Sequence, residues 1–158
     1  MEIERKFLSS IPENISSYKM KEFEQFYLCS DPVIRVRREG DEYFLTYKSK
    51  GLMEREEANF PLTEEAYLHL LQKADNPPIR KKRYFIPIEG TTLHIDFDIF
   101  EGELFPLVMG EIEFESGNAA KAFDIKSVPF FKKEVTYDKD YHNSNLARYG
   151  LPRSFTDE

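Results

Sequence analysis

Hydrophobic and polar residues alternate along many short segments of this chain. In Val33-Ile34-Arg35-Val36-Arg37, for example, both arginines fall on one side and the apolar residues between them on the other. Because successive side chains of a strand point to opposite faces, this period of two predicts β-strands. We expect strands near residues 2–8, 24–29, 33–39, 42–49, 54–62, 79–88, 92–100, 109–115 and 131–137.

Helical spacing is clearest from Glu64 to Ala74, where Tyr67, Leu70 and Leu71 recur behind Thr63, an expected N-cap. We predict helices near residues 13–22, 64–74, 118–124 and 140–148. Short antiparallel strands with hairpin-length connections predict a closed barrel or a sandwich.

The polar faces of these strands are sorted by sign. Cations dominate the middle strands, through Arg35 with Arg37, Thr46 with Lys48, Arg55 with Glu57 and Asn59, and Lys81 with Arg83. Carboxylates dominate the others, through Glu2 and Glu4 beside Lys6, Asp96 with Asp98, and Glu111 with Glu113 and Glu115.

Two interpretations fit this sorting. An antiparallel sheet often has one solvated face, so the polar residues could form the outside of a sandwich. A solvated face normally mixes the two signs, however, and like charges on one strand are destabilising. Several opposite faces are also apolar, which favours a barrel covered from outside, with its charges pointing into a tunnel that holds a polyanion and divalent cations.

Composition limits the function classes. A chain of 158 residues with a net charge of −7 forms one domain and is a poor candidate for a general nucleic-acid or membrane-surface binder. The single cysteine, Cys29, excludes an intramolecular disulfide and suits a cytoplasmic protein. Charged residues from position 2 onward argue against a signal peptide, and no apolar run approaches membrane length. No feature specifies an oligomeric state.

The sequence resembles the CYTH-domain family, also called triphosphate tunnel metalloenzymes. The resemblance starts at Glu2-x-Glu4-x-Lys6, which matches the ExExK signature of that family, and reaches Tyr141-x-Asn143. Between them, in order, come Arg35-x-Arg37, Thr46-x-Lys48, Arg55-x-Glu57, Lys81-x-Arg83, Asp98, Glu111-x-Glu113 and Glu134-Val135-Thr136. ExExK alone is a weak signal, but this ordered series is specific. Asn59 and Lys132-Lys133 depart from the family pattern and bear on substrate preference more than on metal chemistry.

The resemblance implies an α+β fold: an eight-stranded antiparallel β-barrel tunnel with flanking helices, open at both ends. Residues 1–158 would form a single CYTH domain, with 145–158 a flexible C-terminal extension. The substrate-binding cations would be Lys6, Arg35, Arg37, Lys48, Arg55, Lys81 and Arg83. Mg²⁺ or Mn²⁺ would be held by Glu2, Glu4, Asp98, Glu111 and Glu113, which form the catalytic set together with Lys6 and Glu57.

The implied function is divalent-metal-dependent hydrolysis of inorganic tripolyphosphate or another small triphosphate compound. A class IV-type adenylate cyclase, a thiamine triphosphatase and a non-catalytic polyphosphate-binding module are the alternatives. Glu57 could bind metal or only orient Arg55, and Glu134 could be catalytic or structural. His69, His94 and His142 lack metal-ligand spacing, so we expect them at the surface or in packing.

Overall fold

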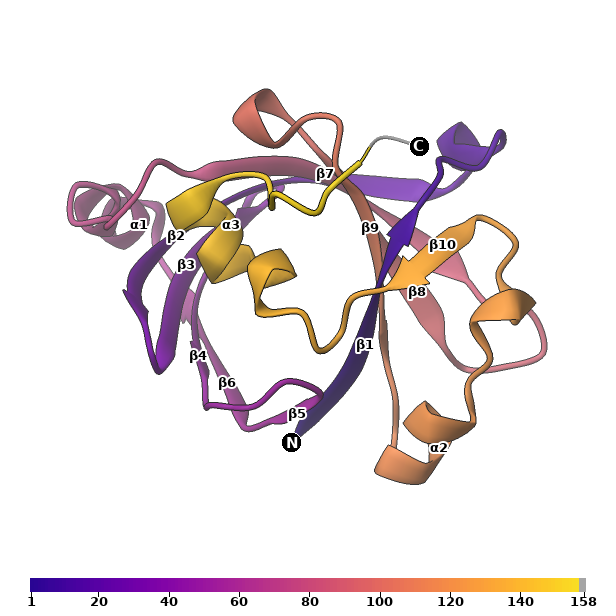
Figure 1. Ribbon diagram of the computed structural model, residues 1–158. Coiled ribbons are helices and arrows are strands. Elements are labelled where there is room, and N and C mark those ends of the chain that lie inside the picture. The colour runs from indigo at the N-terminus through magenta and orange to yellow at the C-terminus, as the bar shows by residue number, and fades with distance from the viewer. Residues whose placement is uncertain (157–158) are drawn as a thin grey trace.

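The computed structural model describes residues 1–156 and contains a ten-stranded antiparallel sheet curled into a nearly closed barrel (Figure 1). The strands are β1 (Glu2–Ser9), β2 (Lys19–Ser30), β3 (Val33–Glu39), β4 (Glu42–Lys48), β5 (Glu54–Arg55), β6 (Glu57–Leu62), β7 (Ile79–Pro87), β8 (His94–Phe100), β9 (Val108–Glu113) and β10 (Phe131–Glu134). The helices are α1 (Glu64–Leu71), α2 (Gly117–Ala122) and α3 (Asn143–Tyr149).

The sheet closes through β1. One edge of β1 pairs with β9, and the other edge is shared between β5 near Glu2 and β10 near Phe7. The path β1-β9-β8-β7-β2-β3-β4-β6 returns to β1 through β5, which is separated from β6 only by Glu56. Counting β5 and β6 as one interrupted strand, the ring has the predicted eight positions, and β10 is an additional strand beside it.

The predicted helix at residues 13–22 is wrong. The chain forms a short 3₁₀ turn at Ile15–Ser17, and β2 already begins at Lys19. From there to Gln25, β2 pairs in register with β7, with Lys21 opposite Arg83. A ladder of backbone hydrogen bonds with a neighbouring strand outweighs the local helical tendency, as tertiary context often does.

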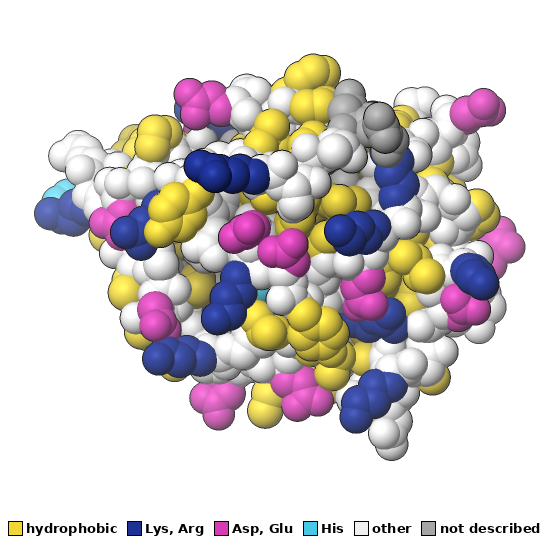
Figure 2. Space-filling model, in the orientation of Figure 1, with side chains coloured by type: hydrophobic (Ala, Val, Ile, Leu, Met, Phe, Trp, Pro, Cys, Tyr) yellow, Lys and Arg dark blue, Asp and Glu magenta, His cyan; other side chains and the backbone are white. Residues whose placement is uncertain are grey.

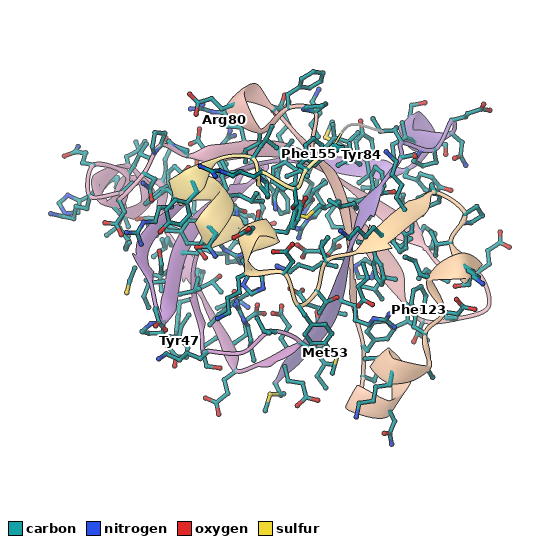
Figure 3. The ribbon with its side chains drawn as sticks, in the orientation of Figure 1. Tyr47, Met53, Arg80, Tyr84, Phe123 and Phe155 are labelled. Atoms are coloured by element: carbon teal, nitrogen blue, oxygen red, sulfur yellow. The ribbon has the colours of Figure 1, made fainter. Side chains whose placement is uncertain are left out.

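Much of the outer surface of the barrel is apolar and covered. Phe26 and Val36 pack against Tyr67 of α1, while Phe7 and Ile112 pack in a second cluster with Ala120 of α2. Phe123, just after α2, and Tyr47, on β4, lie outside the barrel wall (Figure 3). Because helices and loops bury these outer faces, the polar faces of the same strands must point inward.

A third cluster lies at one end of the barrel, under α3. Inward-facing positions become apolar there, as at Tyr27, Val33 and Phe100, and Leu146 of α3 packs with them. Leu151 and Phe155 also pack against this cluster, so part of the expected extension at 145–158 covers it. The last two residues of that extension, 157–158, lie outside the described residues.

The resemblance implies a tunnel open at both ends, but apolar side chains and α3 fill this end of the barrel. Burial of Leu146 explains the difference, because an apolar residue of α3 gains hydrophobic stabilisation by sealing the barrel. Within residues 1–156, no helix is both long enough and apolar enough to span a membrane.

We expect Gly110→Ala to destabilise the protein by about 1–3 kcal/mol, the usual result of overpacking a core. A Cβ atom at Gly110 would lie 2.6 Å from Cε1 of Phe131, whose ring stacks on Phe7 at a centroid distance of 4.5 Å. Urea unfolding measures the change. Phe131→Leu removes the obstructing ring, so the double variant should lose less than the sum of the single losses. Strict additivity would contradict the proposed contact.

Candidate functional site

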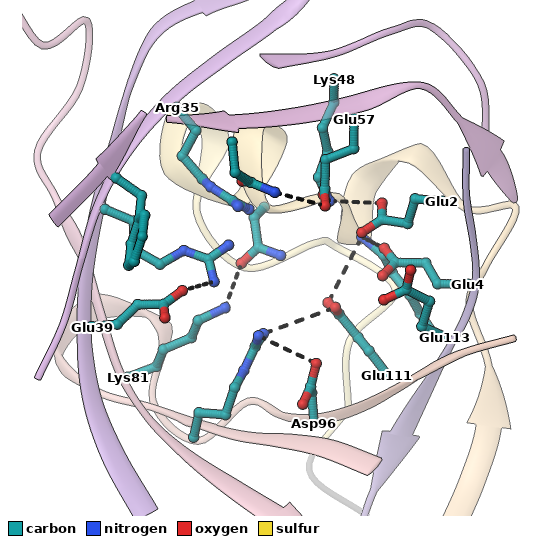
Figure 4. Close-up of a pocket in the computed structure, with 16 residues that line it drawn as sticks. Glu2, Glu4, Arg35, Glu39, Lys48, Glu57, Lys81, Asp96, Glu111 and Glu113 are labelled. Atoms are coloured by element: carbon teal, nitrogen blue, oxygen red, sulfur yellow. Dashed lines mark hydrogen bonds and ion pairs between the residues drawn. The ribbon is translucent and has the colours of Figure 1, made fainter. Parts of the chain in front are cut away.

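The inward polar faces form a cavity of about 330 Å³, drawn with its 16 lining residues in Figure 4. Its carboxylates are Glu2, Glu4, Glu39, Glu57, Asp96, Glu111 and Glu113. Its cations are Lys6, Arg35, Arg37, Lys48, Lys81 and Arg83, and Phe44, Asn59 and Asn143 complete the lining. All of the predicted site residues except Arg55 and Asp98 therefore meet in one cavity.

Charge is distributed differently inside the barrel and on its surface. On the face of the molecule shown in Figure 2, Lys and Arg side chains are interspersed with Asp and Glu. Inside, β3 and β7 carry mainly cations, while β1 and β9 carry mainly carboxylates, with Glu4 directly opposite Glu113. The separation of cations from carboxylates that the sequence predicted is therefore found inside the barrel.

A buried acid holds two of the cations in place. Asp98 accepts hydrogen bonds from Nε and Nη2 of Arg83 at 2.7 and 2.8 Å, and Nζ of Lys81 lies 2.7 Å from the same carboxylate. Asp98 is 0% exposed and does not line the cavity. Both of its oxygens are therefore engaged by cations. Asp98 lies behind the cation wall, the part of the cavity lining formed by Arg35, Arg37, Lys81 and Arg83.

The cation wall has unused hydrogen-bonding capacity. The Nε atoms of Arg35 and Arg37 are buried and have no hydrogen-bond partner. Burial, then the charges of Arg35 and Arg83, lowers the pKa of Arg37 to about 9. Phe23 lies beneath the wall, with Cζ of Arg83 4.8 Å from its ring centroid. Buried donors that repel one another are stabilised by an anion that accepts from several of them.

The carboxylate wall, formed by Glu2, Glu4, Glu111 and Glu113, carries an excess of negative charge. Nζ of Lys48 lies 2.9 Å from Oε1 of Glu2, and Nζ of Lys6 is 3.9 Å from Oε1 of Glu111. Both of these carboxylate oxygens are buried and have no hydrogen-bond partner among the described residues. Burial, followed by the charge of Glu4, raises the pKa of Glu2 to about 8. Burial and neighbouring carboxylates also raise the pKa of Glu113. An additional cation would relieve this repulsion.

The donor set fits a hard metal ion, although the described residues do not form a preassembled metal centre. No group of three or more Asp, Glu, His or Cys side chains within residues 1–156 surrounds a single metal position. Mg²⁺ typically binds through one or two carboxylates together with substrate phosphate oxygens, and not in an all-protein cage. The oxygens of Glu2, Glu4, Glu111 and Glu113 suit that mode.

Glu57 lines the cavity and does not orient Arg55. Its carboxylate lies 3.4 Å from Nζ of Lys48 and accepts a hydrogen bond from Nδ2 of Asn59 at 3.1 Å. Arg55 instead donates to the Gly51 carbonyl at 2.9 Å, and its Nη2 is 3.3 Å from Nδ1 of His142. Arg55 thus lies at the covered end of the barrel, next to a separate void of about 20 Å³.

The N-cap and the first residue of α3 supply side chains that were not predicted in the site from the sequence. His142 is buried, and burial together with Lys6 and Arg55 lowers its pKa to about 3. Oδ1 of Asn143 lies 3.4 Å from Nζ of Lys81. Only tertiary structure could show this, because these two residues are distant in sequence from the barrel strands that they meet.

Two further lining residues were detectable. Glu39 continues the alternation of Arg35 and Arg37 along β3, and Phe44 shares the parity of Thr46 along β4. Extending the period of two by one step in each strand would have found both.

Glu134 lies away from the cavity. Nε and Nη2 of Arg5 donate to its two carboxylate oxygens, each at 2.7 Å. Nη1 of Arg5 donates to the carbonyl oxygens of Ala120 and Phe123, each at 2.8 Å. One guanidinium group therefore fastens β1, β10 and the end of α2 together on the outer face of the barrel, and Glu134 has a structural position.

The chain is similar to a known protein family, to two curated relatives and to a solved structure. The CYTH domain family matches residues 1–139. The inorganic triphosphatase of Nitrosomonas europaea is 36% identical over 150 residues, 92% of this chain and 96% of that protein. The inorganic triphosphatase of Acetivibrio thermocellus is 36% identical over 154 residues, 93% of each chain. The crystal structure of the inorganic triphosphatase NE1496 has a TM-score of 0.68 and 34% identity, covering 93% of this chain and 94% of that one.

We expect the contribution of Glu134 to stability to depend on pH. Its hydrogen bonds with Arg5 lower its pKa, so this contribution is fully present above the ordinary pKa of a glutamate and is lost as pH falls through the lowered folded value. Urea midpoints of the wild type and Glu134→Gln should therefore differ at pH 7 and converge towards pH 3. A difference that stayed constant over this range would show that the carboxylate charge is not the cause.

Proposed function

The chain belongs to the CYTH domain family, and from this membership and its charged cavity we propose that it is a metal-dependent inorganic triphosphatase. One observation carries the proposal. Buried guanidinium donors of Arg35 and Arg37 without acceptors face a cavity whose other wall carries Glu111, a buried carboxylate with an unpartnered oxygen. A polyanion bound together with a divalent cation satisfies both walls.

A linear triphosphate suits the cation wall. It carries several negative charges, and arginine binds phosphate oxygens through two parallel hydrogen bonds. In hydrolysis a water attacks the terminal phosphorus, the bond from that phosphorus to the bridging oxygen breaks, and orthophosphate and pyrophosphate leave. Arg35, Arg37, Lys81 and Arg83 would orient the chain and stabilise the negative charge that develops on the leaving oxygen.

The metal would bind at the carboxylate wall. Proteins of this family are metal-dependent in general, and we propose Mg²⁺ or Mn²⁺ held by Glu2, Glu4, Glu111 and Glu113. When bound, such an ion neutralises phosphate charge and activates the attacking water. Asp98, whose oxygens already bind two cations, would position Lys81 and Arg83 instead of ligating metal.

The remaining predicted residues keep supporting roles in this proposal. Lys6 and Lys48 would bridge the phosphate and the carboxylates, and Glu57 would hold Lys48. Arg55 would act from the covered end, beside His142. We further propose that residues 1–158 act as one domain in the cytoplasm, without nucleic-acid or membrane partners.

The decisive experiment is an assay of purified protein against tripolyphosphate, pyrophosphate, ATP and thiamine triphosphate, with Mg²⁺, Mn²⁺ or chelator. We expect metal-dependent release of orthophosphate, fastest from tripolyphosphate. Glu113→Gln should reduce turnover more than about 100-fold, since even partners of metal ligands often contribute 10- to 100-fold.

Glu115→Gln is the matched control, because this acid follows on the same side of the chain but lies outside the cavity. Metal should also raise the melting temperature of the wild type more than that of Glu113→Gln. Faster formation of cyclic AMP from ATP than of orthophosphate from tripolyphosphate would instead identify a cyclase.

For the cation wall, we expect Arg35→Ala to lower kcat/KM for tripolyphosphate by about 10- to 100-fold. Hydrogen bonds to charged groups contribute about 1.5–3 kcal/mol, which corresponds to this range. Arg35→Lys should recover only part, because the ammonium group cannot form the paired contact. Arg38→Ala, on the opposite face of β3, should have little effect. Unchanged kinetics of Arg35→Ala would remove this residue from the substrate site.

A further inference from the structure

One carboxylate lies within the cation wall. Glu39 ends β3, on the same face as Arg35 and Arg37, and it lines the cavity (Figure 4). Its Oε1 lies 3.1 Å from Nη1 of Arg37, and its side chain is 28% exposed. It is therefore an internal anion that occupies a donor of a substrate-binding arginine.

Glu39 lies at the open end of the cavity. Inward positions along β3 run from Val33, which packs in the apolar cluster under α3, through Arg35 and Arg37 to Glu39. β7, on the other side of β2, changes in the same direction from apolar Ile79 to the cations Lys81 and Arg83. The apolar end is sealed by α3, so the mouth beside Glu39 is the direction in which a bound chain can extend.

We propose that Glu39 is a specificity-determining residue that limits the length of the bound polyphosphate; this proposal rests on the function proposed above. A phosphate that binds Arg37 displaces the Arg37–Glu39 ion pair, and the freed carboxylate remains at the mouth. A triphosphate seated on the cation wall ends near this point. An additional phosphate meets the charge of Glu39 in a partly buried site, where like charges repel more strongly than in bulk water.

This role differs from merely orienting Arg37. If Glu39 only held the guanidinium group of Arg37 in place, its removal would weaken the binding of all phosphate chains to a similar degree. If it repels an extending chain, its removal favours longer chains selectively. The ratio of the kcat/KM values of two substrates, measured on the same enzyme at the same saturating metal concentration, separates the two roles, because a loss of folded protein lowers both values equally and cancels.

The experiment compares tripolyphosphate with tetrapolyphosphate. We expect Glu39→Gln to raise the ratio of kcat/KM for tetrapolyphosphate to that for tripolyphosphate at least about fivefold, equivalent to about 1 kcal/mol. Glu39→Asp keeps the charge and should remain close to the wild-type ratio. Glu22→Gln is the matched control, because this exposed acid on the outer face of β2 accepts, through its carbonyl, the Gly40 amide at 2.9 Å, beside the same turn.

An unchanged ratio in Glu39→Gln, or an equal rise in Glu22→Gln, would overturn the proposal. Titration calorimetry of the two polyphosphates without metal gives a separate test on the same variants. If the wild type hydrolyses neither compound but its binding preference shifts in Glu39→Gln, the proposed hydrolase function fails and the role of Glu39 stands. If the wild type binds neither compound, both proposals fail.

Discussion

The structure depends on keeping many charged side chains inside a barrel. Each buried charge loses hydration, and a single Arg, Lys or Glu in this position would be strongly destabilising on its own. Grouping cations on β3 and β7 opposite carboxylates on β1 and β9 gives a partial solution. Asp98 shows how close the compensation can be, since its two oxygens serve both Lys81 and Arg83. Within residues 1–156, the buried charged groups that keep an atom without a hydrogen-bond partner are Glu2, Arg35, Arg37 and Glu111, and all four line the cavity.

A repulsive interior requires the wall to be stabilised from outside. The apolar outer faces of the strands provide this through Phe7, Phe26 and Ile112 under the covering helices and β10. Arg5 joins three elements through its guanidinium group while its sequence neighbours Glu4 and Lys6 face the cavity. The alternation of a strand thus separates stability from function at consecutive residues. Functional sites commonly retain strain in this way, which the surrounding packing balances.

The inward faces also change character along the barrel axis. On β3 they are apolar beneath α3, cationic in the middle and acidic at the other end, as Val33, Arg35 and Glu39 illustrate. The apolar end is therefore part of the hydrophobic core, and the cavity begins where the cations begin. A polyphosphate in such a site has a defined deep end and a defined exposed end, so the fold gives a direction to binding as well as affinity.

The inward direction of the charges required their sorting by sign, the apolar opposite faces and the family resemblance. The period of two was sufficient to predict most of the strands and which residues share a face. This succeeds because side-chain direction in a strand is a local property of the backbone. Local patterns fail where pairing with a distant strand decides the structure. Part of the helix predicted at residues 13–22 is strand β2, because the chain there pairs with β7, with Lys21 opposite Arg83. The position of Asp98 behind the cation wall, and of His142 at the covered end, likewise depends on distances between separate elements. The sequence by itself therefore determined which face of each strand is charged. Only the tertiary structure decided which charges meet and which end of the barrel is sealed, because those outcomes depend on contacts between residues far apart along the chain.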